Sequence, residues 1–213
     1  MSYFHLLNRG VEKRKIFSDF NNYSRFTHNI SDFNDENDSV LPFHQRRHCS
    51  LTSKNPLADI LVWCLMPNHF HIFVKVEEGK ETNTGNFSKK ITSGYTQYFN
   101  IKNERKGVLF QGRTKIISIS KEKHFLYLPY YILSNPIKLI QPDWKETGIK
   151  NLDKTLKFLK EYKWSSLYEI INDKVPYPKI TNTEHLFSIL GAKNKTDFVK
   201  DFESWLSATA IFS

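Results

Sequence analysis

The run from His69 to Val76 constrains the fold of this chain more than any other feature. Successive side chains of a β-strand point to opposite faces of the sheet, so residues two apart share a face. One face would then carry four apolar side chains: Phe70, Ile72, Val74 and Val76. The other face would carry His69 and His71, whose imidazoles can converge on one ion. The segment therefore predicts a strand with a core face and a face for chemistry.

The histidine pair alone leaves two interpretations open. Half-exposed strands often carry polar residues at alternate positions, and many such pairs bind no metal. A second motif lies downstream, where Tyr131 and Asn135 are four residues apart. If this segment is helical, the phenol and the carboxamide lie on one helix face, one turn from each other. A nucleophile and a third metal ligand would then be carried together.

The two motifs resemble those of the HUH single-tyrosine transposases of small bacterial insertion sequences, and among them the REP-associated tyrosine transposases. Residues 66–71 are similar to the family's HUH strand, and residues 131–136 to its Tyr-x-x-x-Asn-Pro helix. Three further segments agree and follow the family's order: Asn8-Arg9-Gly10, residues 93–100 and residues 107–113. The resemblance covers roughly the first 140 residues and extends more faintly to residues 162–166.

This resemblance implies transesterification at a phosphodiester of single-stranded DNA, at hairpin-associated sites. Tyr131 would attack the phosphorus and form a 5′-phosphotyrosine intermediate, leaving a free 3′-hydroxyl. A divalent ion held by His69, His71 and Asn135 would polarise the scissile phosphate and stabilise the developing charge. Imidazole and carbonyl oxygen ligands, completed by phosphate oxygens, favour Mg²⁺ or Mn²⁺ over a closed structural Zn²⁺ site. The choice between these two ions stays open.

Several tyrosines compete for the role of nucleophile. A free tyrosine has a pKa of about 10, so its anion at pH 7 lies about 4 kcal/mol uphill and needs a stabilising neighbour. Tyr127 shares the helix face of Tyr131, whereas Tyr130 points elsewhere and has Ser134 rather than Asn four residues later. Tyr131 is therefore the predicted nucleophile. The alternative is a buried tyrosine whose hydroxyl bonds a backbone carbonyl.

The charge of the chain favours a polyanionic partner. Its formal net charge is +9, and basic proteins gain affinity for nucleic acid by releasing counterions. Much of the excess lies between residues 81 and 123, which hold nine Lys or Arg against three Glu. We single out Arg9, Arg113 and Lys115 as DNA contacts, although each could equally be a solvated surface side chain. The predicted partner is single-stranded or hairpin DNA.

Hydrophobic periodicity predicts an α+β protein. Strands are expected at residues 3–7, 60–65, 69–76 and 114–119, and helices at 19–33, 86–103 and 121–135. The order β-α-β-β-α-β-α describes a ferredoxin-like antiparallel sheet with helices on one face and an added helix that carries the tyrosine. Helical segments at 152–162 and 185–205 would form a C-terminal extension.

We expect a catalytic domain at residues 1–140 and a helical extension at 141–213 that packs on the same core. The sequence does not indicate the function of this extension. Residues 31–39 are acidic and predict a polar loop, and His5 on the first strand is expected to be structural.

Pro129 conflicts with a regular helix around Tyr131. Either the helix begins near Pro129, or it kinks there and points Tyr131 toward the metal.

The remaining sequence features concern disulfides, targeting signals and membrane spans, and they indicate where in the cell the protein is expected. Cys49 and Cys64 form no Cys-x-x-Cys pattern, which argues against a disulfide framework or a zinc ribbon. No signal-peptide pattern is present, and the apolar stretch near residues 57–66 is too short to span a bilayer. We therefore expect a cytoplasmic, nucleoid-associated monomer or homodimer without a membrane partner.

Two other functions stay open at this stage. One is a catalytically inactive or domesticated DNA-binding protein of the same fold. The other is a metal-dependent hydrolase that uses water as the nucleophile, which would leave Tyr131 dispensable.

Overall fold

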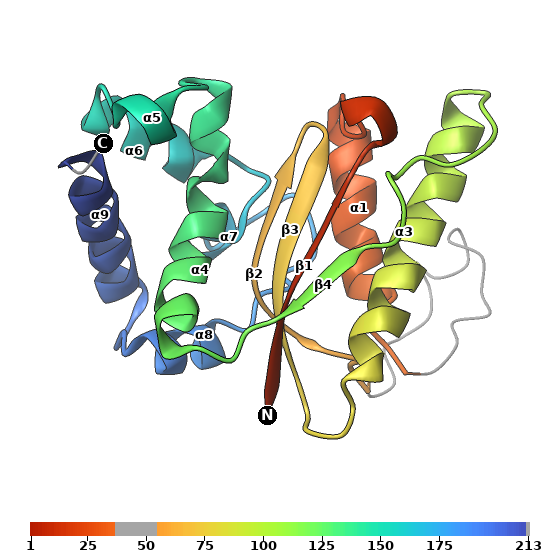
Figure 1. Ribbon diagram of the computed structural model, residues 1–213, viewed down its shortest axis with the longest axis horizontal. Coiled ribbons are helices and arrows are strands. Elements are labelled where there is room, and N and C mark those ends of the chain that lie inside the picture. Colours follow the sequence, from red (N-terminus) through yellow and green to blue (C-terminus); the bar gives the residue numbers. More distant parts are fainter. Residues whose placement is uncertain (37–54, 212–213) are drawn as a thin grey trace.

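The computed structural model describes residues 1–36 and 55–211 (Figure 1). Cys49 and the part of the predicted polar loop beyond Glu36 lie outside these residues. The strands are β1 (Ser2–Arg9), β2 (Asp59–Met66), β3 (His69–Val76) and β4 (Lys115–Ser118). The α-helices are α1 (Phe20–Asp32), α3 (Thr82–Lys102), α4 (Glu122–Ser134), α5 (Trp144–Thr147), α6 (Leu152–Glu161), α7 (Ser166–Ile171), α8 (Thr183–Leu190) and α9 (Lys195–Ile211). Two short 3₁₀ helices are η1 (Val11–Lys13) and η2 (Asn135–Leu139).

The strands form one sheet in the order β2-β3-β1-β4, and every neighbouring pair is antiparallel. In this register Leu7 of β1 lies opposite His71 of β3, and Arg9 lies opposite His69. Lys115 of β4 lies opposite Leu7 on the other side of β1. The strand order and the helix crossovers confirm the predicted α+β, ferredoxin-like architecture.

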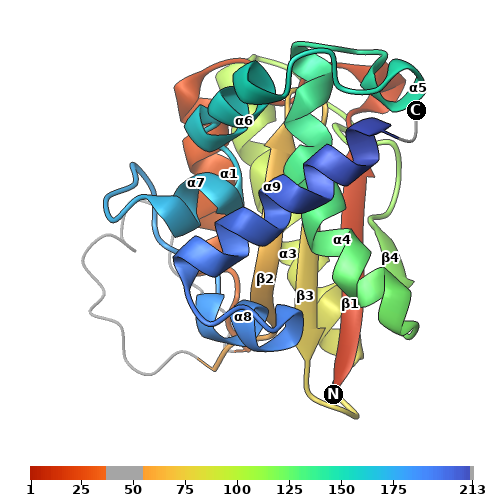
Figure 2. The same cartoon turned by 90° about the vertical axis from the view of Figure 1, so that its left-hand side faces the viewer.

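Helices α1 and α3 cover one face of the sheet, and α4 with the C-terminal helices covers the other (Figures 1 and 2). The first face builds a core with the predicted apolar row of β3, which is almost completely buried: Phe70, Ile72, Val74 and Val76. The Phe26 ring of α1 packs 5.0 Å from the Phe70 ring, measured between centroids. Gly94 of α3 allows the close approach of α1, because a Cβ there would meet the Phe33 ring at 2.5 Å. The predicted core face of β3 is confirmed.

A second core lies between the other sheet face and helices α4 to α9. Phe73 of β3 and Leu61 of β2 share this core with Ile132 of α4 and with Phe198 and Phe202 of α9. Side chains from the predicted extension therefore pack together with those of α4, although the proposed domain boundary at residue 140 stays a prediction. No helix among the described residues combines the length and the apolarity needed to cross a bilayer.

The C-terminal helical segment is interrupted where a single helix pattern had been expected. Helix α8 ends at Gly191, which adopts a left-handed conformation with φ of 72° and ψ of 12°. Glycine reaches this conformation without steric cost, so it commonly ends helices. The amide of Ala192 then donates to the carbonyl of Phe187, and α9 starts at Lys195.

Candidate functional site

The histidines occupy the first positions of β3, directly after the turn that joins it to β2. The end of β1 holds this turn in place, because the amide of Gly10 donates to the carbonyl of Asn68 at 2.9 Å. Only glycine fits at this point, since a Cβ would lie 2.5 Å from the carbonyl oxygen of Arg14. The Asn-Arg-Gly segment noted in the sequence therefore fixes the turn, and it sets Arg9 directly opposite His69.

His69 and His71 lie side by side on the sheet face that α4 covers. Their ring centroids are 5.1 Å apart with the planes at 84°. The Nδ1 atom of His69 lies 2.6 Å from Oδ1 of Asn68, and Nδ1 of His71 lies 2.9 Å from Nε2 of His5. With Nδ1–H as the donor in both contacts, Nε2 of each predicted ligand keeps its lone pair. Partners of this kind commonly orient metal-binding histidines.

His5 acts as the orienting partner of His71, a role that goes beyond the structural one expected from sequence. It pairs directly with Phe73, so His71 is its diagonal neighbour across β1 and β3. The two rings stack with centroids 5.1 Å apart. The contact depends on the register between β1 and β3, which are far apart in the chain. No local pattern in the sequence predicts that register.

The surroundings keep all three imidazoles neutral near pH 7. Burial lowers the pKa of His5 to about 4. Burial, and then the positive charges of Arg9 and Lys138, lower the pKa of His69 to about 4. Burial also lowers the pKa of His71 well below its usual value, with the neighbouring histidines and cations adding to the effect. Neutral imidazole is the form that binds a metal ion.

Tyr131 lies next to this pair on α4. The helix begins at Glu122 and continues through Pro129, so the interpretation that it begins near Pro129 is wrong. Proline cannot donate to the carbonyl of Phe125, and the preceding turn tolerates this loss. The ring of Tyr131 meets that of His71 edge to face, with centroids 6.1 Å apart. The structure thus brings together the predicted nucleophile and a predicted metal ligand.

Asn135 follows the last residue of α4, one position beyond the helix end, and it begins η2. Its side-chain nitrogen donates to the carbonyl of Tyr131 at 2.8 Å and to that of Ile132 at 3.3 Å. The expected one-turn spacing of Tyr131 and Asn135 is therefore present. Within the described part of the chain these bonds use only the nitrogen, which leaves the buried amide's oxygen Oδ1 for another partner.

The neighbouring tyrosines differ from Tyr131 in their surroundings. Tyr130 packs against Phe198 and Phe202 of α9, and burial raises its pKa to about 12. Tyr127 is half exposed and stacks on Tyr131 with centroids 5.6 Å apart; burial raises its pKa too. Tyr131 is partly buried, and its hydroxyl bonds no group among the described residues, in contrast to the buried alternative considered from sequence.

The chemistry of the predicted donors is compatible with a divalent ion that also binds phosphate oxygens and water. No group of three His, Cys, Asp or Glu side chains among residues 1–36 and 55–211 is arranged to hold a metal, so a closed zinc centre is not built here. The ring centroids of His69 and His71 are 5.1 Å apart, and together with the Asn135 oxygen these imidazoles would form three neutral donors that leave coordination positions for phosphate oxygens and water. Mg²⁺ and Mn²⁺ suit such a site through the phosphate oxygens and waters that would complete the coordination.

Positive charge surrounds the histidines, and sequence reasoning found only part of it. Arg9 was predicted, whereas Lys138 of η2 and Lys145 of α5 were missed; all three depress the histidine pKa values through their charges. Lys138 stands three residues after Asn135, so extending the Tyr-Asn helix face by one turn could have found it. The position of Lys145 depends on how the chain turns after η2 and has no sequence signal.

The structure separates the other two predicted DNA contacts. Lys115 lies opposite Leu7 and therefore points to the same sheet face as His71. Arg113 instead lines a groove of about 950 Å³ between the polar face of α3 and the segment that leads into β4. Thr92 and Gln97 of α3 line the same groove. Arg113 and Lys115 therefore lie on different surfaces of the protein.

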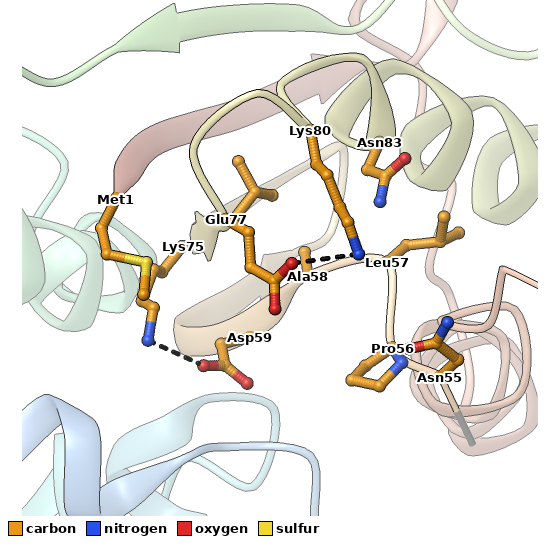
Figure 3. A pocket seen from close by; sticks show the side chains of 11 residues that line it. Met1, Asn55, Pro56, Leu57, Ala58, Asp59, Lys75, Glu77, Lys80 and Asn83 are labelled. Atoms are coloured by element: carbon orange, nitrogen blue, oxygen red, sulfur yellow. Dashed lines mark ion pairs between the residues drawn. The ribbon is translucent and has the colours of Figure 1, made fainter. Parts of the chain in front are cut away.

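A second, smaller pocket lies at the far end of β3 from His69 (Figure 3). Its volume is about 140 Å³. Two ion pairs cross it, Lys75 with Asp59 at 3.4 Å and Lys80 with Glu77 at 3.0 Å. None of the predicted site residues lines it.

Comparisons with known proteins bear on the fold. No protein-family model matches the sequence, and no curated protein matches it significantly. A solved structure of a REP-associated tyrosine transposase bound to a REP hairpin is similar, with a TM-score of 0.52 and 17% sequence identity. The match covers 83% of this chain and 82% of that chain. The chain therefore shares the fold of that transposase across most of its length.

Proposed function

We propose that this protein is a metal-dependent single-stranded DNA endonuclease and strand transferase that acts through a 5′-phosphotyrosine on Tyr131. The observation that carries the proposal is the contact between the rings of Tyr131 and His71. Within a fold shared with a tyrosine transposase, the phenol of Tyr131, whose hydroxyl bonds no described residue, lies against His71, one of two neighbouring buried imidazoles.

The reaction is a transesterification in which bond number and charge balance. The Oη atom of Tyr131 bonds to the phosphorus as the bond from phosphorus to the 3′-oxygen breaks. The phenol proton passes to water, and the departing 3′-oxygen takes up a proton to become a hydroxyl. The phosphotyrosine keeps the ester, so the 3′-hydroxyl of a second DNA end can later attack it and rejoin the strands.

His69, His71 and Asn135 would hold the ion in this proposal, and Mg²⁺ or Mn²⁺ would supply Lewis-acid polarisation of the scissile phosphate. The residues of the chain prepare that site before any ion binds. Asn68 and His5 hold the two imidazoles through Nδ1, and the backbone of Tyr131 holds the amide of Asn135.

Hairpin or single-stranded DNA is the proposed partner. The net charge of +9 and the cations around the histidines favour a phosphate backbone, and the similar transposase structure is bound to a REP hairpin. Arg9 lies beside the histidines, whereas Arg113 and Lys115 extend toward the α3 groove and the β4 edge. We propose a cytoplasmic protein associated with DNA, as a monomer or homodimer.

The position of a DNA label tests the mechanism. A hairpin oligonucleotide with single-stranded flanks is incubated with the protein and Mn²⁺ or Mg²⁺, using one sample labelled at the 3′ end and another at the 5′ end. A 5′-phosphotyrosine retains the 3′ fragment, so only the 3′ label should migrate with the denatured protein. Tyr131→Phe should abolish the adduct, while Tyr127→Phe, which alters the stacked neighbour, should retain it.

Other outcomes identify the alternatives. Equal cleavage by the wild type and by Tyr131→Phe, without an adduct, would establish a hydrolase that uses water. Tight binding to hairpins with no cleavage of any of them would instead indicate a DNA-binding protein of the same fold.

A further inference from the structure

Lys145 stands over the candidate nucleophile, although it lies on a different element. Its Nζ atom is 4.4 Å from the centroid of the Tyr131 ring. Trp144, the preceding residue, is buried in the core beneath α4 and the C-terminal helices. That anchor fixes the start of α5 and holds Lys145 at the edge of the site.

The ammonium group of Lys145 has no carboxylate partner among the described residues. Lys150, only five residues further on, is by contrast paired with Asp143 at 3.2 Å. Glu146 is a sequence neighbour that acts on Lys145 through its charge and forms no ion pair with it. Partial burial lowers the pKa of Lys145, and the positive charge of nearby Lys138 lowers it further. Two neighbouring cations without a carboxylate between them favour the binding of an anion.

We propose that Lys145 is a further catalytic residue of the reaction assigned above, in which its ammonium stabilises the negative charge that develops on the Tyr131 side chain. This inference rests on the proposed function. As Oη bonds to phosphorus and the phenol proton passes to water, negative charge spreads from Oη into the ring. A cation over the ring face opposes that charge directly, and it attracts an anionic ring more strongly than a neutral one.

The geometry also explains why a lysine suits this position. An ammonium is a compact point charge on a flexible stem, so it can stay over the ring and turn toward a phosphate oxygen when DNA binds. Arg9, on the opposite strand from His69, and Lys138 remain available for the flanking phosphates. The three cations come from three different elements, β1, η2 and α5.

The first test measures adduct formation with the 3′-labelled hairpin oligonucleotide under single-turnover conditions. Lys145→Gln should slow it by about 10- to 100-fold, less than the loss of a fully buried oxyanion donor, because Lys145 is only partly buried and solvent screens its charge. Lys145→Arg should restore most of the rate, since it keeps the charge. Lys150→Gln, which removes one charge from the same region, is the matched control and should retain the wild-type rate.

The second test needs neither DNA nor an added ion. N-acetylimidazole acetylates nucleophilic phenols, and peptide mass spectrometry reports the extent at each tyrosine. Lys145→Gln should slow acetylation of Tyr131 severalfold relative to Tyr127 in the same molecule, and Lys150→Gln should leave the ratio unchanged. Circular dichroism of each variant establishes that it is folded.

The two tests separate the two proposals. If the wild type forms no adduct but Lys145→Gln still slows acetylation of Tyr131, the proposed function fails while the coupling of Lys145 to the phenol stands. If the wild type forms the adduct and Lys145→Gln matches Lys150→Gln in both assays, the role of Lys145 is overturned. An unchanged acetylation ratio together with a missing adduct overturns both.

Discussion

The two faces of β3 carry different kinds of side chain and have different surroundings. On one face Phe70, Ile72 and Val74 are completely buried against α1 and α3. On the other face the strand is apolar only at Phe73, and His71 near its beginning meets the Tyr131 ring of α4. The first face of the strand carries only apolar side chains, whereas the second carries two histidines and a lysine beside Phe73. Stability and chemistry are therefore expected to separate along a single strand.

Two tyrosines repeat this contrast. Tyr95 of α3 is buried on the first face, its hydroxyl donates to the carbonyl of Ile16, and burial raises its pKa. Tyr131 on the other face is partly exposed, and its hydroxyl bonds nothing in the described residues. One phenol is fixed within the core, and the other is the proposed nucleophile.

The largest effect on the first face should come from Phe70→Ala. Removing a fully buried phenyl ring leaves a cavity among the rings of Phe26 and Phe110, and such substitutions cost about 3–5 kcal/mol of unfolding free energy. Chemical denaturation measures this loss. Phe70→Leu keeps most of the volume and should cost much less. The folded fraction of Phe70→Ala should still form the DNA adduct, and a specific loss of chemistry would contradict the separation of the faces.

The adjacent residue should show the reverse pattern. His69→Ala should lower the rate of adduct formation by about 100-fold, because it removes a proposed ligand, while changing the unfolding free energy by no more than about 1 kcal/mol. A chelator should abolish activity of the wild type, and added Mn²⁺ should restore it there but not in His69→Ala. His124→Ala, at an exposed position in the first turn of α4, is the control. Wild-type turnover by His69→Ala in Mn²⁺ would exclude the proposed ligand set.

Features of the site that depend on local periodicity could be predicted from the sequence. Alternation along β3 placed Phe70 in the core and His69 on the other face, and a spacing of four placed Asn135 one turn from Tyr131. Each of these predictions needs only the geometry of a single strand or helix. The proline at position 129 was the exception, since tertiary packing holds α4 together through it.

Features that depend on contacts between distant segments could not be predicted. His5 reaches His71 only because β1 and β3 pair in one particular register. Lys145 reaches Tyr131 only because η2 and α5 turn the chain back over α4. Neither residue belongs to a periodic pattern, so its proximity to the site becomes visible only in the assembled fold. The core face of β3 could be predicted from the alternation along one strand, whereas the contacts of the histidines and of Tyr131 became visible only in the tertiary structure.

The smallest predicted effect compares the two phenols directly. Tyr95→Phe keeps the buried ring but leaves the carbonyl of Ile16 without its donor, which should cost about 1–3 kcal/mol of unfolding free energy. Tyr131→Phe removes a hydroxyl that bonds no described residue, so its unfolding free energy should stay within about 0.5 kcal/mol of the wild type. Equilibrium denaturation of both variants under the same conditions measures the difference. A loss in Tyr131→Phe as large as that in Tyr95→Phe would mean that its hydroxyl supports the fold, and a structural explanation of its position would then replace the catalytic one.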